Sequence, residues 1–317
     1  MGLPLPHGKL AMWLFLVTEI TFFTALIGTY MLLRNGQPTN FVPWPAPHDV
    51  HLIEAIGAIN TFVLICSSLT VVLCHWYLHE ARKASDELQK KALVKKAVMY
   101  LSITLALGGV FLVIKAYEYK AKFEHEILPS RIYELKNDGP QSYKYLRHVQ
   151  AQLKHIAEHG GVNDEAKPMC TALLAEIDAG KLTPKEVNER ILGTQRMKEK
   201  NPGEKDMKTK RSSYCDLPEK SKPADAPLIK GILEVDPHAH LSFSIPYGNL
   251  WASCYFAMTG FHAVHVFGGL VIFGVYLILY CLGKFGPQNE LGIELTGLYW
   301  HFVDIVWIFL FPLLYLV

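Results

Sequence analysis

Long apolar runs dominate the pattern of the chain, and polar stretches separate them. Five runs are long enough to cross a bilayer as helices, because about 20 residues at about 1.5 Å each span the hydrocarbon core. These runs are Ala11–Leu33, Ile53–Leu78, Val94–Tyr117, Asn249–Leu282 and Leu298–Val317. The pattern therefore predicts an all-α membrane protein with five transmembrane helices, three before a long polar insertion and two after it.

The polar insertion, roughly Lys120–Ile245, has apolar positions at helical spacing in its first half. One apolar stripe precedes Gly160, and a second precedes Gly180. Thr183 and Glu186 then have the spacing of a capping box, with a proline at the first helical position. The two stripes are Leu146, Val149, Leu153 and Ile156, followed by Cys170, Leu173, Leu174 and Ile177. We therefore expect a small, mainly helical soluble domain.

Residues Lys198–Pro227 differ from the rest of the insertion, because lysines, acids and prolines alternate there with few large apolar side chains. This composition is typical of a segment that wraps over other surfaces or stays mobile. The predicted organisation is residues 1–119 with helices 1–3, a periplasmic insertion at 120–247, and residues 248–317 with helices 4 and 5.

The short loop between the second and third spans sets the predicted orientation. Its basic residues are Arg82, Lys83, Lys90, Lys91, Lys95 and Lys96, whereas the loop between the first two spans has none after Arg34. Cytoplasmic loops carry the excess of lysine and arginine, while long loops cross largely regardless of charge. We therefore expect the N-terminus inside, with the insertion and the C-terminus outside.

The first run is too long for a signal-peptide core and contains Glu19, so we interpret it as a retained span.

Several ionisable side chains lie within or beside the apolar runs, where they are energetically expensive and therefore candidates for function or subunit contact. They are Glu19, Glu118, His262, His265, His301 and Asp304. Positions three apart share a helix face, so His301 and Asp304 can satisfy each other or a common partner. For His262 and His265 we favour polar contacts between helices or with lipid over metal ligation. A bis-histidine haem would need two imidazoles facing each other at matched depth, and His75 lies only at the polar end of its span.

Lys9 and Trp13 lie one turn apart at the predicted inner boundary of the first span. A lysine there can reach a lipid phosphate, and tryptophan is common at the same depth. The pair suits a lipid headgroup site and, equally, ordinary anchoring at the interface.

The cysteines have no CxxC, haem-attachment or zinc spacing. Cys170 and Cys215 in the insertion are candidates for a disulfide if that domain faces an oxidising compartment.

Five motifs in order resemble subunit III of a haem-copper cytochrome c oxidase, in its five-helix bacterial form. They are GKLAMWLFLVTEITFFTALIGTY with Lys9 and Glu19, INTFVLICSSLTV leading to His75, IKAYEY with Glu118, FAMTGFHAVHVFGGL with His262 and His265, and LYWHFVDIVWIFLF with His301 and Asp304. Together they cover nearly all of the predicted membrane part. The insertion departs from the family, where a short connection joins the corresponding spans.

The resemblance implies a non-catalytic subunit of a proton-pumping oxidase in aerobic respiration, located in a bacterial inner membrane. It implies no redox cofactor on this chain, with haem and copper on subunits I and II. It also implies contact with subunit I, bound phospholipid near Lys9, Trp13 and His75, and support of proton uptake. Glu19 matches the intramembrane glutamate of the family. Its carboxyl is either satisfied by a Ser, Thr or His on a neighbouring helix or takes part in proton supply.

The sequence leaves alternative functions open. Quinol oxidases and some nitric oxide reductases have similar third subunits, so the electron donor is not defined. A haem-bearing membrane anchor also uses few spans with intramembrane histidines, and a stoichiometric Soret band would identify it. The insertion is expected to contact or stabilise subunit II or other respiratory subunits. Docking of an electron donor is the alternative, although the near-balanced charge gives no support for electrostatic steering. We expect no nucleic-acid partner.

Overall fold

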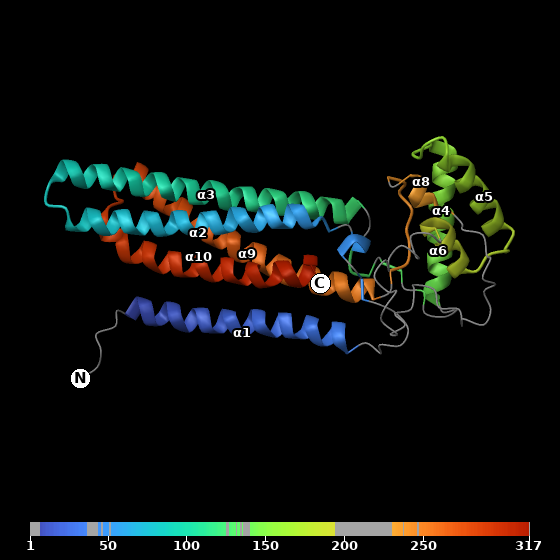
Figure 1. Ribbon diagram of the computed structural model, residues 1–317, viewed down its shortest axis with the longest axis horizontal. Helices are drawn as coiled ribbons and strands as arrows, with labels where there is room; N and C mark the ends of the chain where they lie inside the picture. The colour runs from blue at the N-terminus through green and yellow to red at the C-terminus, as the bar shows by residue number, and fades with distance from the viewer. Residues whose placement is uncertain are drawn as a thin grey trace, which may run out of the picture. The chain divides into compact units, whose positions relative to one another are not determined.

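The computed structural model of the chain describes residues 7–36, 44–45, 47–50, 52–124, 127–130, 132–133, 135, 140–193, 230–236, 238–245 and 247–316. These residues are mainly helical, and they contain no strand beyond an isolated bridge between Tyr133 and Ser244. The long helices are α1 His7–Asn35, α2 Glu54–Lys83, α3 Glu87–Glu124, α9 Gly248–Cys281 and α10 Glu290–Phe311, which continues into η3 Pro312–Leu316 (Figure 1). The prediction of an all-α protein is confirmed.

Among the described residues, five helices are long and apolar enough to cross a membrane, as the apolar runs predict. The third is longer than predicted, because α3 extends from Glu87 to Glu124 and includes the charged residues on both sides of its apolar run. The last candidate span begins earlier than predicted, at Pro287, and includes the short η2 helix Pro287–Asn289 before α10. Helical geometry thus continues past the apolar boundaries that the sequence marks.

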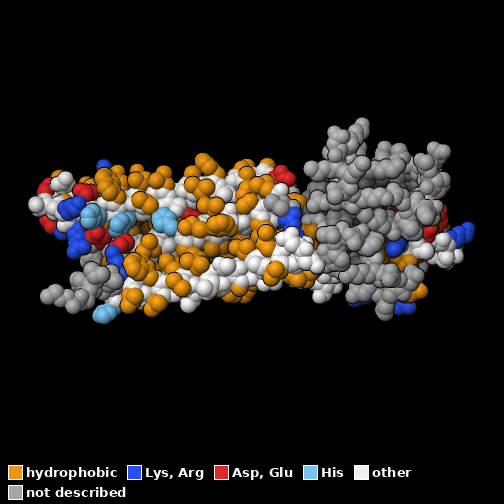
Figure 2. All heavy atoms as spheres, turned by 60° about the horizontal axis from the view of Figure 1, so that its bottom comes forward, with side chains coloured by type: hydrophobic (Ala, Val, Ile, Leu, Met, Phe, Trp, Pro, Cys, Tyr) orange, Lys and Arg blue, Asp and Glu red, His pale blue; other side chains and the backbone are white. Residues whose placement is uncertain are grey.

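The described chain forms two compact units. The membrane unit comprises residues 1–32, 51–121 and 254–317, and the insertion unit comprises residues 33–50 and 122–253. Figure 2 shows apolar side chains spread over the long helices, with basic, acidic and histidine side chains gathered towards one end of them. This distribution is typical of helices that meet lipid along their length.

Close helix packing in the membrane unit centres on Trp300 of α10. A Cβ atom on Gly108 of α3 would lie 2.9 Å from the Trp300 ring, and one on Gly269 of α9 would lie 2.6 Å from it. Glycine therefore allows α3 and α9 to approach this indole. The indole N–H of Trp300 donates to the hydroxyl of Ser67 on α2 at 2.9 Å, so the fully buried ring retains its hydrogen bond.

Helix α1 is the least buried of the long helices. Only Phe23 and Tyr30 are buried among its described side chains. It contacts α9 and α10 through aromatic rings, including Phe22 with Phe261 at 5.0 Å and Phe23 with Phe302 at 6.1 Å between centroids. The rest of α1 exposes large apolar side chains, as expected of a helix that meets lipid or another subunit.

The insertion unit has its own apolar core, built from α4 Pro140–His159, α5 Ala166–Asp178, α6 Pro184–Leu192 and α8 Ile232–Val235. The expected apolar stripes of α4 and α5 provide Val149, Leu153 and Leu173 to this core. The predicted helix start is confirmed as a capping box, because the backbone N–H of Thr183 donates to Glu186 at 2.7 Å and that of Glu186 donates to the Thr183 hydroxyl. The backbone N–H and the hydroxyl of Thr183 both donate to the Glu186 carboxylate, and these two hydrogen bonds lower the pKa of that carboxyl.

Cys170 is a buried free thiol in the core of the insertion unit. Burial raises its pKa to about 11. The other partner of the proposed disulfide, Cys215, and the segment Lys198–Pro227 lie outside the described residues.

Candidate functional site

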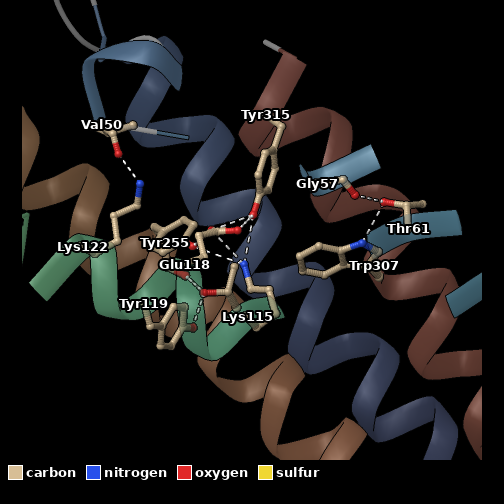
Figure 3. A network of polar contacts seen from close by, with 11 residues as sticks. Val50, Gly57, Thr61, Lys115, Glu118, Tyr119, Lys122, Tyr255, Trp307 and Tyr315 are labelled. Atoms are coloured by element: carbon tan, nitrogen blue, oxygen red, sulfur yellow. Dashed lines mark hydrogen bonds and ion pairs between the residues drawn. The ribbon is translucent and has the colours of Figure 1, made fainter. Parts of the chain in front are cut away.

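A buried ion pair joins Lys115 and Glu118 near the end of α3 (Figure 3). The Lys115 ammonium donates to a Glu118 carboxylate oxygen at 3.0 Å, and the two side chains are only 4% and 10% exposed. The hydroxyl of Tyr315 donates to Glu118 at 2.7 Å and accepts from Lys115 at 3.0 Å, while Tyr255 also donates to Glu118. The pair therefore connects α3 with α9 and with the C-terminal η3.

Aromatic rings surround the Lys115 ammonium. Its nitrogen lies 5.0 Å from the centre of the Trp307 ring and 5.4–5.6 Å from the rings of Tyr119, Tyr255 and Tyr315. Such ring faces attract a cation within about 6 Å. A buried charge is tolerated when it is paired and its hydrogen bonds are satisfied, and both conditions are met here. This arrangement can hold a positive charge within the protein and keep three chain segments together.

Glu19 of α1 and His265 of α9 form a second polar contact between helices. Glu19 Oε2 lies 3.0 Å from His265 Nε2, and His265 Nδ1 lies 2.7 Å from the carbonyl oxygen of Phe261. A carbonyl oxygen only accepts, so Nδ1 carries a hydrogen. Nε2 then either accepts from a protonated Glu19 or donates to its carboxylate. In both cases one proton is shared between the two side chains, so the pair can hold a proton and transfer it internally.

His301 and Asp304 share a face of α10 but do not bond to each other. The imidazole of His301 is hydrogen-bonded through Nδ1 to the Ser68 hydroxyl of α2. Both carboxyl oxygens of Asp304 are buried without a hydrogen-bond partner among the described residues. The direct pair that their spacing allows is therefore not formed, because the neighbouring helix supplies a hydroxyl to the imidazole instead.

His262 lies on the buried side of α9, between Phe111 and Trp307. The ring centroids are 5.6 Å and 5.1 Å apart, respectively. Within the described part of the chain, neither ring nitrogen of His262 has a hydrogen-bond partner. Its contacts with described residues are aromatic, and the polar contact between helices that the sequence offered is not formed among them. His262 and His265 thus differ, since only His265 reaches an acid.

Two glutamates near the start of α10 form ion pairs with basic side chains at the polar ends of α1 and α2. Lys9 of α1 lies 2.5 Å from Glu294, while His79 and Arg82 of α2 contact Glu290 at 2.7 Å and 3.2 Å. Lys9, a candidate for a lipid phosphate or for ordinary anchoring at the interface, is paired here with a protein carboxylate. Trp13 is 49% exposed on α1, and the ring of His75 stacks on His79 with 6.4 Å between centroids.

Several residues of these contacts are not predicted from the sequence. They are Lys115, Tyr255, Tyr315, Glu290, Glu294 and Ser68. Lys115 could have been found, because it lies three residues before Glu118 and therefore on the same helix face. Glu290 and Glu294 lie one turn apart at the start of the last span. The two tyrosines carry no such signal, since tyrosine is common at the ends of membrane helices.

Fold and contacts define a multi-pass helical membrane protein with buried polar contacts between its helices. Residues 232–317 match the family described as cytochrome c oxidase subunit III. This segment includes His262, His265, His301 and Asp304. Individual proteins with similar sequences also bear the name cytochrome c oxidase subunit 3.

Three relatives illustrate the match. Cytochrome c oxidase subunit 3 of Thermostichus vulcanus is 46% identical over 69 residues, which are 22% of this chain and 34% of the relative. The protein of the same name from Synechocystis is 49% identical over 69 residues, 22% of this chain and 30% of the relative. A probable cytochrome c oxidase subunit 3 of Mycobacterium tuberculosis is 42% identical over 74 residues, 23% and 36% of the two chains.

The matched part spans about a third of the length of these curated relatives. These matches support membership of this chain in the cytochrome c oxidase subunit III family. The family match covers only its C-terminal residues 232–317.

Proposed function

We propose that the chain is the non-catalytic third subunit of a proton-pumping haem-copper oxidase in a bacterial inner membrane. The observation that carries this proposal is the match of residues 232–317 to cytochrome c oxidase subunit III. Haem and copper are assigned to subunits I and II, and electron transfer takes place there. The role of this chain is to contact subunit I, hold phospholipid and support proton uptake.

The contact between Glu19 and His265 supports a proton-related role. Its two side chains come from different helices and share one proton, so the pair can hold a proton inside the membrane unit without creating an isolated charge. Such a pair buffers the local proton supply rather than performing chemistry on oxygen. We assign structural roles to four other polar side chains, which would hold the membrane helices in place against one another. They are Asp304, His301, His262 and Glu118.

Exposed apolar side chains along α1 support contact with lipid or with subunit I. Trp13 lies on this helix, one turn from Lys9. Because Lys9 is paired with Glu294, we assign the headgroup contact mainly to Trp13 and to the polar end of α2 with His75. This end faces the cytoplasm in the proposed orientation, which follows from the basic loop after α2.

The insertion unit is proposed to lie in the periplasm and to contact other respiratory subunits. Its helices bury Leu153, Cys170 and Ile191 in a core of their own. An apolar core is what a stable extramembrane cap requires. Protease added to intact spheroplasts should cut within residues 198–210, whereas cleavage only in inside-out vesicles would reverse the orientation.

The role as a supporting subunit is tested by depleting this chain from the purified oxidase. The remaining complex should keep its haem spectrum and begin oxygen consumption, then lose activity faster than the complete complex does. Re-addition of the chain should restore the lifetime in turnover. Immediate loss of all electron transfer in a spectrally normal complex would contradict a supporting role.

A further inference from the structure

Two histidines lie one turn apart at the C-terminal end of α4 in the insertion unit. His155 and His159 are exposed, their ring centroids are 4.5 Å apart, and the ring planes differ by only 18°. A spacing of four residues places both imidazoles on one face of the helix. Another pair in the chain has this spacing, His75 and His79, but their rings are 6.4 Å apart and His79 is bonded to Glu290.

The turn that carries the pair is held in place by the core below it. Ile156 is buried in the insertion unit, and its carbonyl accepts the N–H of Gly160 at 2.9 Å, which closes the helix end. A Cβ atom on Gly160 or Gly161 would meet nothing within 4 Å, so the space beyond the helix end is open. The two imidazoles therefore project from a rigid element into accessible space.

Local charge at this helix end favours a cation. The last turn of a helix has the negative end of the helix dipole. In addition, a carboxylate oxygen of Glu158 lies 4.0 Å from Nδ1 of His159. Neutral imidazole is a good ligand for divalent copper, nickel and zinc, and a two-histidine pair four residues apart on a helix is a known arrangement for metal binding.

We propose that His155 and His159 form a surface site for one divalent late transition-metal ion, with Cu²⁺ bound most tightly. The order of affinity follows the general preference of nitrogen ligands for Cu²⁺ over Ni²⁺ and Zn²⁺. Water fills the remaining coordination positions, because the site is open. The inference does not depend on the proposed function, since it rests on residues of the insertion unit alone.

The spacing H-x-x-E-H also occurs in a class of zinc proteases, where the glutamate acts as a base. Catalytic zinc sites commonly have three protein ligands. In the part of the chain that the structure describes, no group of three histidine, cysteine or acidic side chains is placed to hold a metal ion. We therefore assign reversible binding and exchange of the ion to this two-histidine site.

The test uses the full chain, purified in detergent without a histidine tag, and CuCl₂ as the probe. Equilibrium dialysis should show one more bound ion per wild-type chain than per H155Q/H159Q chain at the same free copper concentration. The electron paramagnetic resonance spectrum of that ion should show coupling to nitrogen. Both positions are exposed, so the circular dichroism of the variant should match that of the wild type.

A matched control keeps the number of histidines and changes only their spacing. In the A157H/H159Q variant the imidazoles lie two residues apart and point to different faces of α4. Disturbing even an outer partner of a metal ligand lowers affinity about 10–100-fold, so loss of a ligand should weaken this site by at least about tenfold in both variants. Equal copper binding by the wild type and both variants would overturn the proposal.

Discussion

Glu19 of α1 and His265 of α9 share one hydrogen bond, with 3.0 Å between Oε2 and Nε2. The carbonyl of Phe261 fixes the hydrogen on the other ring nitrogen, so the proton between Glu19 and His265 is the one that can move. The contact joins the least buried helix to the helix that contains both histidines of the FHAVH motif. This hydrogen bond ties α1 to α9, and the proposed proton-related role of the pair can be tested at Glu19.

We expect the Glu19→Gln oxidase to assemble and to begin turnover at a near-normal rate. Glutamine keeps the shape of the side chain and can still donate to His265, but it has no titratable proton. A required general acid or base would lower the rate by about 10²–10⁴-fold when removed, whereas a supporting pair should mainly shorten the active lifetime. Haem-normalised oxygen-consumption traces measure both quantities. The exposed Glu54→Gln variant serves as control, and complete initial inactivity of an assembled Glu19→Gln complex would contradict this role.

Breaking the ion pair on α3 should destabilise the membrane unit more than removing it completely. Lys115→Met leaves Glu118 without its cation, and Glu118→Gln leaves the Lys115 ammonium buried without its counter-charge. Loss of one partner of a buried pair typically costs about 3–5 kcal/mol, whereas replacing both is often much less harmful. Thermal unfolding in detergent should therefore place the double variant closer to the wild type than either single variant. Simple addition of the two single effects would show that the residues act independently.

Two adjacent glycines of α3 provide a test of the packing around Trp300. A Cβ atom on Gly108 would lie 2.6 Å from Leu270 and 2.9 Å from the Trp300 ring, whereas one on Gly109 would meet nothing within 4 Å. Gly108→Ala should therefore lower stability by about 1–3 kcal/mol through overpacking. Gly109→Ala should be neutral or stabilise the helix by about 0.5–1 kcal/mol. Retention of each variant on purification and its unfolding temperature would show the difference, and equal behaviour would argue against this helix packing.

Cys170 should resist thiol reagents in the folded protein. It is buried, and its pKa is raised to about 11, so at pH 8 little of the reactive thiolate is present. Mass spectrometry after alkylation should show labelling of Cys170 only when denaturant is added, while the exposed Cys281 should react without it. Labelling that required a reductant as well as denaturant would instead support a disulfide with Cys215. Rapid labelling of native Cys170 would contradict its burial.

Element type was predictable here because the signals are local and strong. The length of each apolar run predicts the five spans, and Thr183 with Glu186 predicts the start of α6. Both depend on residues near one another in the sequence. Helix ends were less predictable, since α3 continues through charged residues to Glu124.

The hydrogen-bond partners that join two helices were less predictable, because they depend on how the packed helices are aligned along their length. The sequence suggested that Glu19 would be satisfied by a Ser, Thr or His, but it did not specify His265. For His301 and Asp304 it offered a direct pair or a common partner, but it did not specify Ser68 of α2, which bonds to His301. Lys115 was overlooked, since a lysine near the end of a span usually extends towards water. Here its ammonium points to Glu118, Tyr255 and Tyr315 instead.

The optical spectrum of this chain, before and after separation from its partners, tests the central claim most directly. An affinity tag on the chain should retain a complex with the haem absorbance of an oxidase, and the chain isolated from that complex should have no stoichiometric Soret band. A Soret band at one haem per isolated chain would contradict a non-catalytic third subunit and would identify a haem-bearing membrane protein instead.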